Sequence, residues 1–113
     1  MINAKSELLA VCDKIQRTIL CADIMHEKFC DDKQITFTLK VGYTECEFEQ
    51  FLKKLDFDYD NGWGTQELFG TVWLTDGTWL DRHEYDGSEF WVQREVPEIP
   101  YYLKHKPTHW ELV

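Results

Sequence analysis

Long apolar runs are absent from this sequence of 113 residues. A membrane-spanning helix needs ~20 consecutive apolar residues, and no stretch approaches that length. The first residues, MINAKSELLAVCDKIQ, also lack a basic segment followed by an apolar block, so a secretory signal peptide is not expected. No Asn-X-Ser/Thr acceptor for N-glycosylation occurs. These absences predict a cytoplasmic protein with no place in a membrane.

Basic residues are scarce, since 12 Lys and Arg stand against 21 Asp and Glu for a net charge of -9. A surface of this sign repels phosphate backbones, so direct binding of nucleic acid is not expected. It favours basic partners, including proteins that themselves hold nucleic acid. Much of the imbalance falls on residues 34–67, a segment with few bases and many acids.

Motifs that would indicate catalysis or a cofactor are missing as well. The sequence has no glycine-rich phosphate loop, no nucleophile elbow and no zinc-binding helix pattern. Its four cysteines are most simply reduced thiols in a cytoplasmic protein, and a helix would turn Cys21 away from Cys12 and Cys30. We therefore expect a non-enzymatic protein without a cofactor.

Glycine and proline do not occur before position 42, so nothing there interrupts a helix. Leu8, Ile15 and Ile19 keep the spacing of one apolar helix face, which predicts a long helix over residues 4–30. QITFTLKV, residues 34–41, then alternates apolar and polar side chains and predicts a half-buried strand.

A capping box marks the start of a second helix. The Thr44 hydroxyl can accept a hydrogen bond from the Glu47 amide, while the Glu47 carboxylate reaches back to the Thr44 amide. Phe48 and Phe51 follow at helical spacing. Residues 45–55 are therefore expected to form a short amphipathic helix.

Two Asp-Gly pairs, at 76–77 and 86–87, separate runs of β-prone residues. Each pair suits a two-residue type I′ turn, which predicts a three-stranded antiparallel meander. Its strands are expected over about residues 68–75, 78–85 and 88–95.

Two-residue turns would fix the register of this meander and thereby its two faces. The face expected to be the core consists of Val72, Leu74, Trp79, His83, Tyr85, Phe90 and Val92. The second face carries Trp73, Leu80, Arg82 and Trp91, rimmed by Glu84 and Glu89. On it, Arg82 over Trp91 would form a cation–π pair. So much aromatic surface is expected to be covered by the long helix, by the tail or by a second subunit, or else to bind a partner.

These elements predict an α+β fold in a single domain, residues 1–113. The helix falls within residues 1–33 and the α+β core within 34–96. The proline-containing segment 97–113 is expected to be an extended tail packed on the domain. Its anchors would be Tyr101, Tyr102, Leu103 and Trp110.

The segment DFDYDNGWGTQE, residues 56–67, fits part of an EF-hand calcium loop. Its calcium ligands would be Asp56, Asp58, Asp60 and Glu67. Two features argue against calcium. Asn61 replaces the usual glycine, and the strand pattern LFGTVWL follows where an EF-hand has a helix.

The same segment has two other interpretations as a strand. Its three aspartates would then point outward, roughly 6.6 Å apart along the chain. With Glu45 and Glu49 of the neighbouring helix, they would form a line of negative charge that suits a site meant for phosphates. The other interpretation is an exposed edge strand whose charges prevent aggregation.

Residues 59–100 carry a block of the type D-G-T/S-W-x-x-R-x-E-Y-D-G-S-E-W-W followed by P-x-I-P. In this respect the chain resembles small uncharacterised proteins of tailed bacteriophages, from Val41 onward. Phe90 stands where the block has tryptophan. The resemblance implies no catalytic residue. It does imply a context in the host cytoplasm, where small acidic phage proteins often disarm restriction or CRISPR effectors, some of them as nucleic-acid mimics.

Three functional hypotheses follow. In the first, the protein binds and inhibits a host bacterial protein that handles nucleic acid. The partner-binding residues would be Glu45, Glu49, Asp56, Asp58, Asp60, Trp73, Arg82 and Trp91. The alternatives are a calcium-binding module built on residues 56–67 and a non-enzymatic accessory protein that forms a homodimer.

Overall fold

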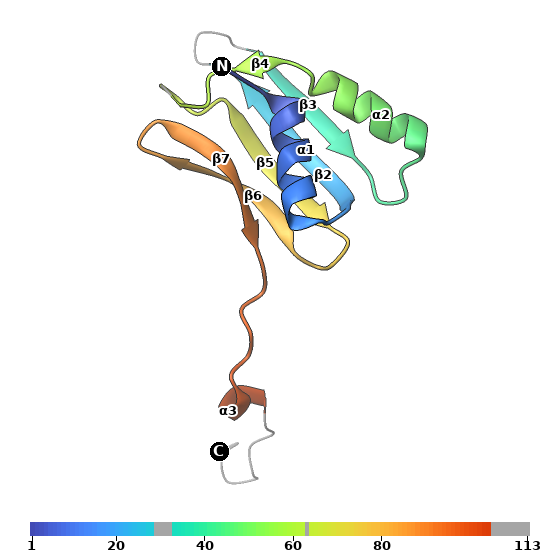
Figure 1. Ribbon diagram of the computed structural model, residues 1–113, viewed down its shortest axis with the longest axis vertical. Helices are drawn as coiled ribbons and strands as arrows, with labels where there is room; N and C mark the ends of the chain where they lie inside the picture. Colours follow the sequence, from blue (N-terminus) through green and yellow to red (C-terminus); the bar gives the residue numbers. More distant parts are fainter. Residues whose placement is uncertain (29–32, 63, 105–113) are drawn as a thin grey trace.

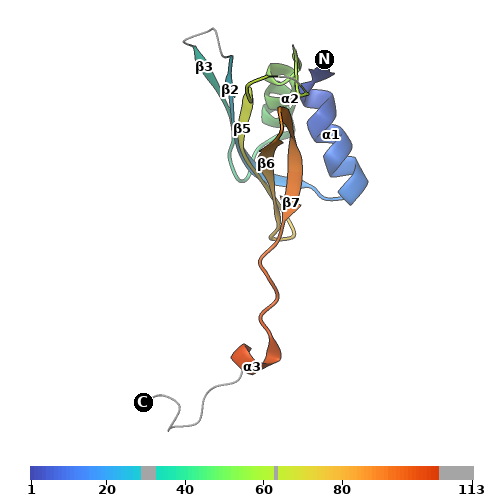
Figure 2. The same ribbon diagram turned by 90° about the vertical axis from the view of Figure 1, so that its left-hand side faces the viewer.

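The computed structural model describes residues 1–28, 33–62 and 64–104. Its elements are β1 Ile2–Asn3, α1 Ala4–Ile15, β2 Ile19–Glu27, β3 Gln34–Leu39, α2 Glu45–Lys54, β4 Asp58–Tyr59, β5 Leu68–Leu74, β6 Trp79–Tyr85, β7 Ser88–Arg94 and α3 Tyr101–Lys104. Helices α1 and α2 lie on the same side of the larger sheet, and no described element covers its other side (Figure 2). The predicted α+β class is confirmed.

The larger sheet has five antiparallel strands in the order β3-β2-β5-β6-β7 (Figure 1). The strand predicted over 34–41 is confirmed as β3, and the predicted meander is confirmed as β5, β6 and β7. The short strands β1 and β4 pair with each other. A buried core lies between the helices and the sheet, and it includes Leu8, Ile24, Phe51 and Leu80.

The prediction of one helix over residues 4–30 was wrong. Helix α1 ends at Ile15 because Gln16 adopts a left-handed backbone conformation, with φ of 52°. The backbone N–H of Gln16 donates to the Asp13 carbonyl and closes the helix. Left-handed C-caps usually contain glycine or asparagine, so the sequence carries no ordinary stop signal at this point.

Strand β2 occupies the second half of that predicted helix. Its pairing with β5 shifts register between Ile19 and Cys21, so the buried residues Ile19 and Ala22 are three positions apart instead of two. An irregularity of this kind disrupts the period of two that identifies a strand. Ile15, Ile19 and Ala22 are therefore spaced in the sequence as the apolar face of a helix would be, although Ile19 and Ala22 belong to a strand.

The predicted second helix is confirmed as α2. Both capping-box hydrogen bonds form, from the Glu47 amide to Thr44 Oγ1 and from the Thr44 amide to Glu47 Oε1, each 3.1 Å long. Phe51 and Leu55 are buried against the sheet. The helix lies over β3, at one end of the sheet (Figure 1).

The two Asp-Gly turns differ in kind. Asp86 and Gly87 have φ of 51° and 85°, as a two-residue type I′ turn requires, and the predicted pairing of Arg82 with Trp91 is confirmed. At the first turn only Gly77 has a positive φ, of 88°. The Gly77 amide donates to the Leu74 carbonyl and the Leu74 amide donates to the Thr78 carbonyl, so this loop is longer than two residues.

The longer loop shifts β5 by one residue against β6. Two-residue turns would pair Leu74 with Trp79, and Val72 would then lie one residue away from Leu80. In the structure, Val72 pairs directly with Leu80. Because side chains alternate between faces, a shift of one residue exchanges the faces of β6 and β7 relative to β5. The predicted grouping of Leu80 with Arg82 and Trp91 holds, but this group lies in the core.

Two corrections of the predicted faces follow from this register. Trp73 lies on the opposite face of the sheet from Arg82 and Trp91, and those two residues are 8% and 7% exposed. The other correction concerns five residues predicted in the core that lie on the uncovered side. They are Trp79, His83, Tyr85, Phe90 and Val92.

The described part of the tail does not pack on the domain as predicted. From the end of β7 it runs away from the sheet to the single turn α3 (Figure 1). Three of the four expected anchors, Tyr101, Tyr102 and Leu103, are exposed by 76%, 77% and 62%. The fourth, Trp110, lies outside the described residues.

Gly70 leaves no room for a side chain between β5 and its partner β2. Its φ is 132°, and a Cβ atom at this position would lie 2.2 Å from the Asp23 carbonyl oxygen. We expect Gly70→Ala to lower the free energy of unfolding by more than about 2 kcal/mol, since two backbones would have to move apart. Gly62→Ala is the control, because its Cβ would meet no atom within 4 Å. Equal urea midpoints for the two variants would contradict this account.

The first Asp-Gly turn holds an unusually acidic carboxyl group. The Thr78 hydroxyl and amide donate to Asp76 Oδ1 at 2.6 and 3.0 Å, and Arg17 Nε lies 2.6 Å from Oδ2. These contacts lower the pKa of Asp76 from 3.8 to about 2. These contacts therefore stabilise the folded state fully above the unfolded-state pKa of Asp76. That stabilisation is lost as pH falls from about 4 toward 2.

A carbon-13 NMR titration of the Asp76 carboxyl group tests this assignment. We expect the group to remain ionised at pH 3 in the native protein. Thr78→Val removes the hydroxyl donor and should raise the pKa toward its usual value. A native midpoint near the usual value would show that the turn does not hold the carboxylate.

Candidate interaction surfaces

A buried polar cluster centres on Arg82. Its Nε and Nη2 atoms donate to Glu89 Oε1 at 3.1 and 2.8 Å. Its Nη1 donates to Glu7 Oε1 at 3.1 Å, and its Nη2 contacts the Tyr59 hydroxyl, which in turn donates to Glu7. The cluster thus joins α1, β4, β6 and β7 at one point.

Neighbouring groups satisfy most of the remaining polar atoms of this Arg82 cluster. The Glu67 and Leu68 amides donate to the Glu89 carboxylate at 2.6 and 3.0 Å. The Arg82 guanidinium lies 5.0 Å from the Trp91 ring centroid, which confirms the predicted cation–π pair inside the core. One buried atom, Trp91 Nε1, has no hydrogen-bond partner among the described residues.

The pKa values in this cluster shift in the directions that its charges require. Burial and the hydrogen bond to Glu7 raise the pKa of Tyr59, so the phenol stays protonated and can donate. Burial alone would lower the pKa of Arg82, but Glu7 and Glu89 outweigh it and raise that pKa. Every member therefore has a structural partner. We interpret the cluster as the clamp that holds the loop before β5 against the sheet.

The five acidic residues predicted to bind a partner form the acidic edge: Glu45, Glu49, Asp56, Asp58 and Asp60. None of them forms an ion pair with another described residue. They do not form one continuous line, because the exposed Lys53 and Lys54 at the end of α2 separate the glutamates from the aspartates. The Asn3 side-chain amide donates to Asp56 and Asp58 at 2.9 and 3.2 Å. These two hydrogen bonds hold both carboxylates in place on the surface.

A mostly apolar hollow of about 610 Å³ opens beside these aspartates. Its apolar lining comes from Ile35 and Phe37 of β3 and from Phe57, and its rim includes Lys54 and Asp58. At one side the His26 ring lies against Phe57, with the ring centroids 4.5 Å apart and the planes tilted by 34°. The acidic edge and the hollow share Asp58. Sequence reasoning predicted the acids but missed the hollow.

The structure does not assemble the predicted calcium loop. Glu67 Oε1 lies 3.0 Å from His26 Nε2, while Asp56 and Asp58 bind Asn3 at the β1–β4 pair. Asp60 accepts a hydrogen bond from the Gly62 amide at 3.1 Å. Over the described ranges, no group of three or more His, Cys, Asp or Glu side chains is placed to hold a metal ion. The strand β5 follows where an EF-hand needs a helix.

The uncovered side of the sheet, called the outer face below, is rich in large side chains. They are Met25, Phe69, Trp73, Trp79, Tyr85 and Phe90. Trp73 and Phe90 are each 41% exposed, while the side chains between them partly cover one another. Asp23 and Asp81 lie in one cross-strand row in the middle of this face. Large apolar side chains that are exposed together on one face are more typical of an interaction site than of plain exposure to solvent.

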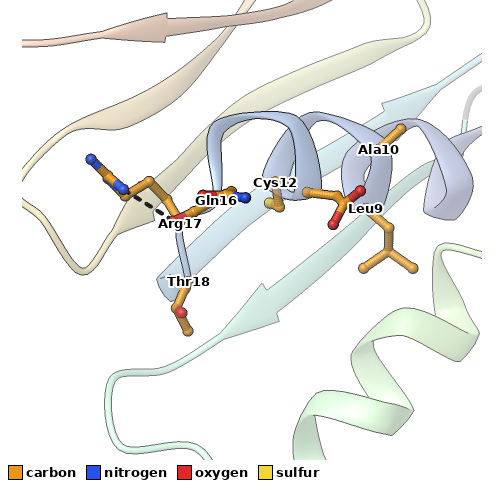
Figure 3. Close-up of a pocket in the computed structure, with 7 residues that line it drawn as sticks. Leu9, Ala10, Cys12, Gln16, Arg17 and Thr18 are labelled. Carbon is orange, nitrogen blue, oxygen red and sulfur yellow. Dashed lines mark hydrogen bonds between the residues drawn. The ribbon is translucent and has the colours of Figure 1, made fainter.

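A further hollow, open and of about 660 Å³, lies along the last turns of α1 (Figure 3). Leu9, Ala10 and Cys12 line it from the helix, and Arg17 and Thr18 from the chain that follows. Burial raises the pKa of the Cys12 thiol, so the thiol stays protonated and is a poor nucleophile. The hollow therefore offers no activated group for covalent chemistry.

Comparison of the chain with models of protein families, with curated proteins and with solved structures gave no significant match. Within the part of the chain that the structure describes, no helix combines the length and apolar character needed to cross a bilayer. The acidic edge, the hollow and the outer face are the surfaces of the described chain that bear on its function.

The Arg82 cluster makes a sharp stability prediction. Arg82→Met leaves Glu89 and Glu7 without their buried cation, so we expect a loss of roughly 3–5 kcal/mol in the free energy of unfolding. Arg94→Met is the matched control, because Arg94 and Asp81 are 3.9 Å apart and each 46% exposed. That variant should lose less than about 1 kcal/mol. Urea denaturation measures both. Similar losses would show that the buried pair has no special role.

Proposed function

We propose that this protein is a non-enzymatic interaction protein of the small acidic phage type, which binds and inhibits a host bacterial protein. The partner would be a nucleic-acid-handling factor of the restriction or CRISPR kind, bound in the host cytoplasm. The contact surface would be the acidic edge together with the apolar hollow beside it. Arg82 and Trp91 are left out of this surface because both are buried. Trp73 is left out because it belongs to the outer face.

One observation carries the proposal, namely that Asp58 belongs to both the acidic edge and the hollow. Protein interfaces concentrate binding energy in an apolar anchor that fills a pocket, with charged groups around the rim. Here Ile35, Phe37 and Phe57 supply the pocket, while Asp58 and Lys54 supply charge at its rim. A partner with a basic surface and one protruding apolar side chain complements this arrangement.

The charges support a partner that normally holds nucleic acid. The five carboxylates of the acidic edge form no ion pair with a described residue, so they project a negative field, and a basic groove built for phosphates attracts such a field. The hollow would add an apolar contact that a nucleic-acid backbone does not offer. Binding should therefore weaken with salt but not vanish as completely as binding by charge alone.

Capture of the partner is the first experiment. Tagged protein would be incubated with bacterial lysate at low and at moderate salt, and the retained proteins identified by mass spectrometry. We expect one nucleic-acid-handling protein, retained more weakly as salt rises. Retention of no such protein at either salt concentration would end the proposal.

Variants of the two parts of the surface then test the site. Glu45→Lys with Glu49→Lys reverses exposed charge, and Ile35→Asp places a charge in the hollow, where Ile35 is 52% exposed. Each should weaken binding of the captured partner at least about tenfold, the equivalent of 1.4 kcal/mol. The control pair, Asp13→Lys with Glu95→Lys, makes the same change of charge away from the acidic edge. Equal weakening by the control would show that only net charge matters.

A further inference from the structure

Strand β3 forms one edge of the larger sheet, and β2 is its only strand partner among the described residues. In an antiparallel pair, every second residue of an edge strand directs its N–H and C=O groups away from its neighbour. Apart from β2, no described residue forms a backbone hydrogen bond with Gln34–Leu39. We infer that this free edge, with the hollow beside it, binds an extended segment of a partner as an additional β-strand. The segment belongs to the host protein of the proposed function, on which the inference rests.

The sequence of β3 leaves its free edge without the usual protection. Proteins commonly guard edge strands with charged residues, proline, bulges or a covering segment. QITFTL contains no charged residue and no proline, and its residues pair with β2 in unbroken register. The opposite edge, β7, differs because the Glu89 amide already donates to the Asn61 carbonyl at 2.7 Å. A strand can therefore be added at β3 more readily than at β7.

Two hollows follow this edge, on the side of the sheet where α2 lies (Figure 1). Residues 35–37 of β3 line the apolar hollow already described. Residues 38–40 line a second hollow of about 260 Å³, and one face of α2, including Glu47, lines its other side. Lys54 lines both hollows. A strand added beside β3 would lie about 4.8 Å from it and would place alternate side chains in the two hollows. In this mode of recognition the main-chain hydrogen bonds give affinity and the side-chain pockets give specificity.

The lining of the two hollows defines the chemistry of the added segment. The first hollow has apolar walls, including Phe57, and suits a large aliphatic or aromatic side chain. Asp58 at its rim suits a basic side chain. In the second hollow Lys40 and Lys54 outnumber the single carboxylate of Glu47, so an acidic side chain fits there.

The direction of the segment follows from the sheet, in which every described pair of neighbours is antiparallel. Residues 35–37 at the apolar hollow precede residues 38–40 at the second hollow, so an antiparallel segment reaches the second hollow first. Side chains on one side of a strand recur at every second residue. From its N-terminus, the segment therefore carries an acidic, an apolar and a basic residue at alternate positions.

Six synthetic peptides and the full chain test the inference. Each peptide is acetyl-Thr-Glu-Thr-X-Thr-Arg-Thr-amide, in which X is Val, Ile, Leu, Phe, Tyr or Trp and the threonines favour a strand. Nitrogen-15 NMR titration follows the backbone amides. We expect at least one peptide to shift the β3 amides saturably while those of β7 stay unchanged. Its affinity should fall at least about tenfold for Ile35→Asp. Val41→Asp is the matched control and should bind as the native chain does, because Val41 is 66% exposed and lines neither hollow.

N-methylation of the peptide distinguishes strand addition from simple insertion of a side chain. The amides of alternate residues point to opposite edges of a strand. Methylation of one alternate set should therefore abolish binding, while methylation of the other set should leave it nearly unchanged. Equal losses from the two sets would overturn the inference, and so would unshifted β3 amides with all six peptides at millimolar concentration. Sedimentation equilibrium supplies a further test, because a native dimer that Ile35→Asp dissociates would assign the free edge to a second copy instead.

The added strand and the host partner can fail separately. If peptides bind at β3 and no host protein is captured, the groove is a peptide site and the inhibitor proposal fails. If Ile35→Asp weakens a captured partner but no peptide binds, that partner uses the hollow without adding a strand. In that case the inference fails and the proposed function stands.

Discussion

The buried charge of Arg82 is the constraint on which the rest of this structure depends. A guanidinium inside a small core is tolerated only when carboxylates and hydrogen-bond acceptors surround it. Glu7, Tyr59 and Glu89 meet that need, and they come from parts of the chain that are far apart in the sequence. Because Arg82 must contact all three of these residues, α1, β4 and the hairpin of β6 and β7 meet around its guanidinium group. The loop before β5 is held there too, because the Glu67 amide donates to the same carboxylate as Arg82.

The same cluster gives a structural meaning to much of the sequence block on which the resemblance to phage proteins was based. In this chain, Arg82 and Glu89 form the buried pair, while Asp86 and Gly87 form the turn that brings their strands together. The block therefore describes a hairpin with an internal ion pair.

Local signals in the sequence were sufficient where one segment determines its own structure. The capping box at Thr44 located α2, and Asp86-Gly87 gave both the turn and the register of its hairpin. Prediction failed where the outcome depended on a distant strand. Gln16 ends α1 without a helix-stop residue, and the irregular pairing of β2 with β5 disguised a strand as a helix. Gly70 was the available signal, because an isolated glycine within a strand pattern marks a close approach of another backbone.

The candidate surfaces were predictable to different degrees for the same reason. The acidic edge could be identified from composition alone, whereas the hollow beside it needs residues from β2, β3, α2 and β4 that only the fold brings together. The outer face was assigned wrongly because a loop longer than expected moved β6 by one position. A single additional loop residue decided whether Trp79 faces the core or solvent.

The interior position of β2 has a consequence for how the chain acquires its fold during synthesis. Its partner β3 follows after a short connection, but its other partner, β5, is made only after α2 and the loop that follows it. Until then, one side of β2 presents unpaired backbone groups, and the apolar residues beneath it have only part of their cover. Pairing over such a sequence separation is slow because the loop must close before any contact compensates for it. The nascent chain is therefore most vulnerable to aggregation in the interval between the emergence of β3 and that of β5.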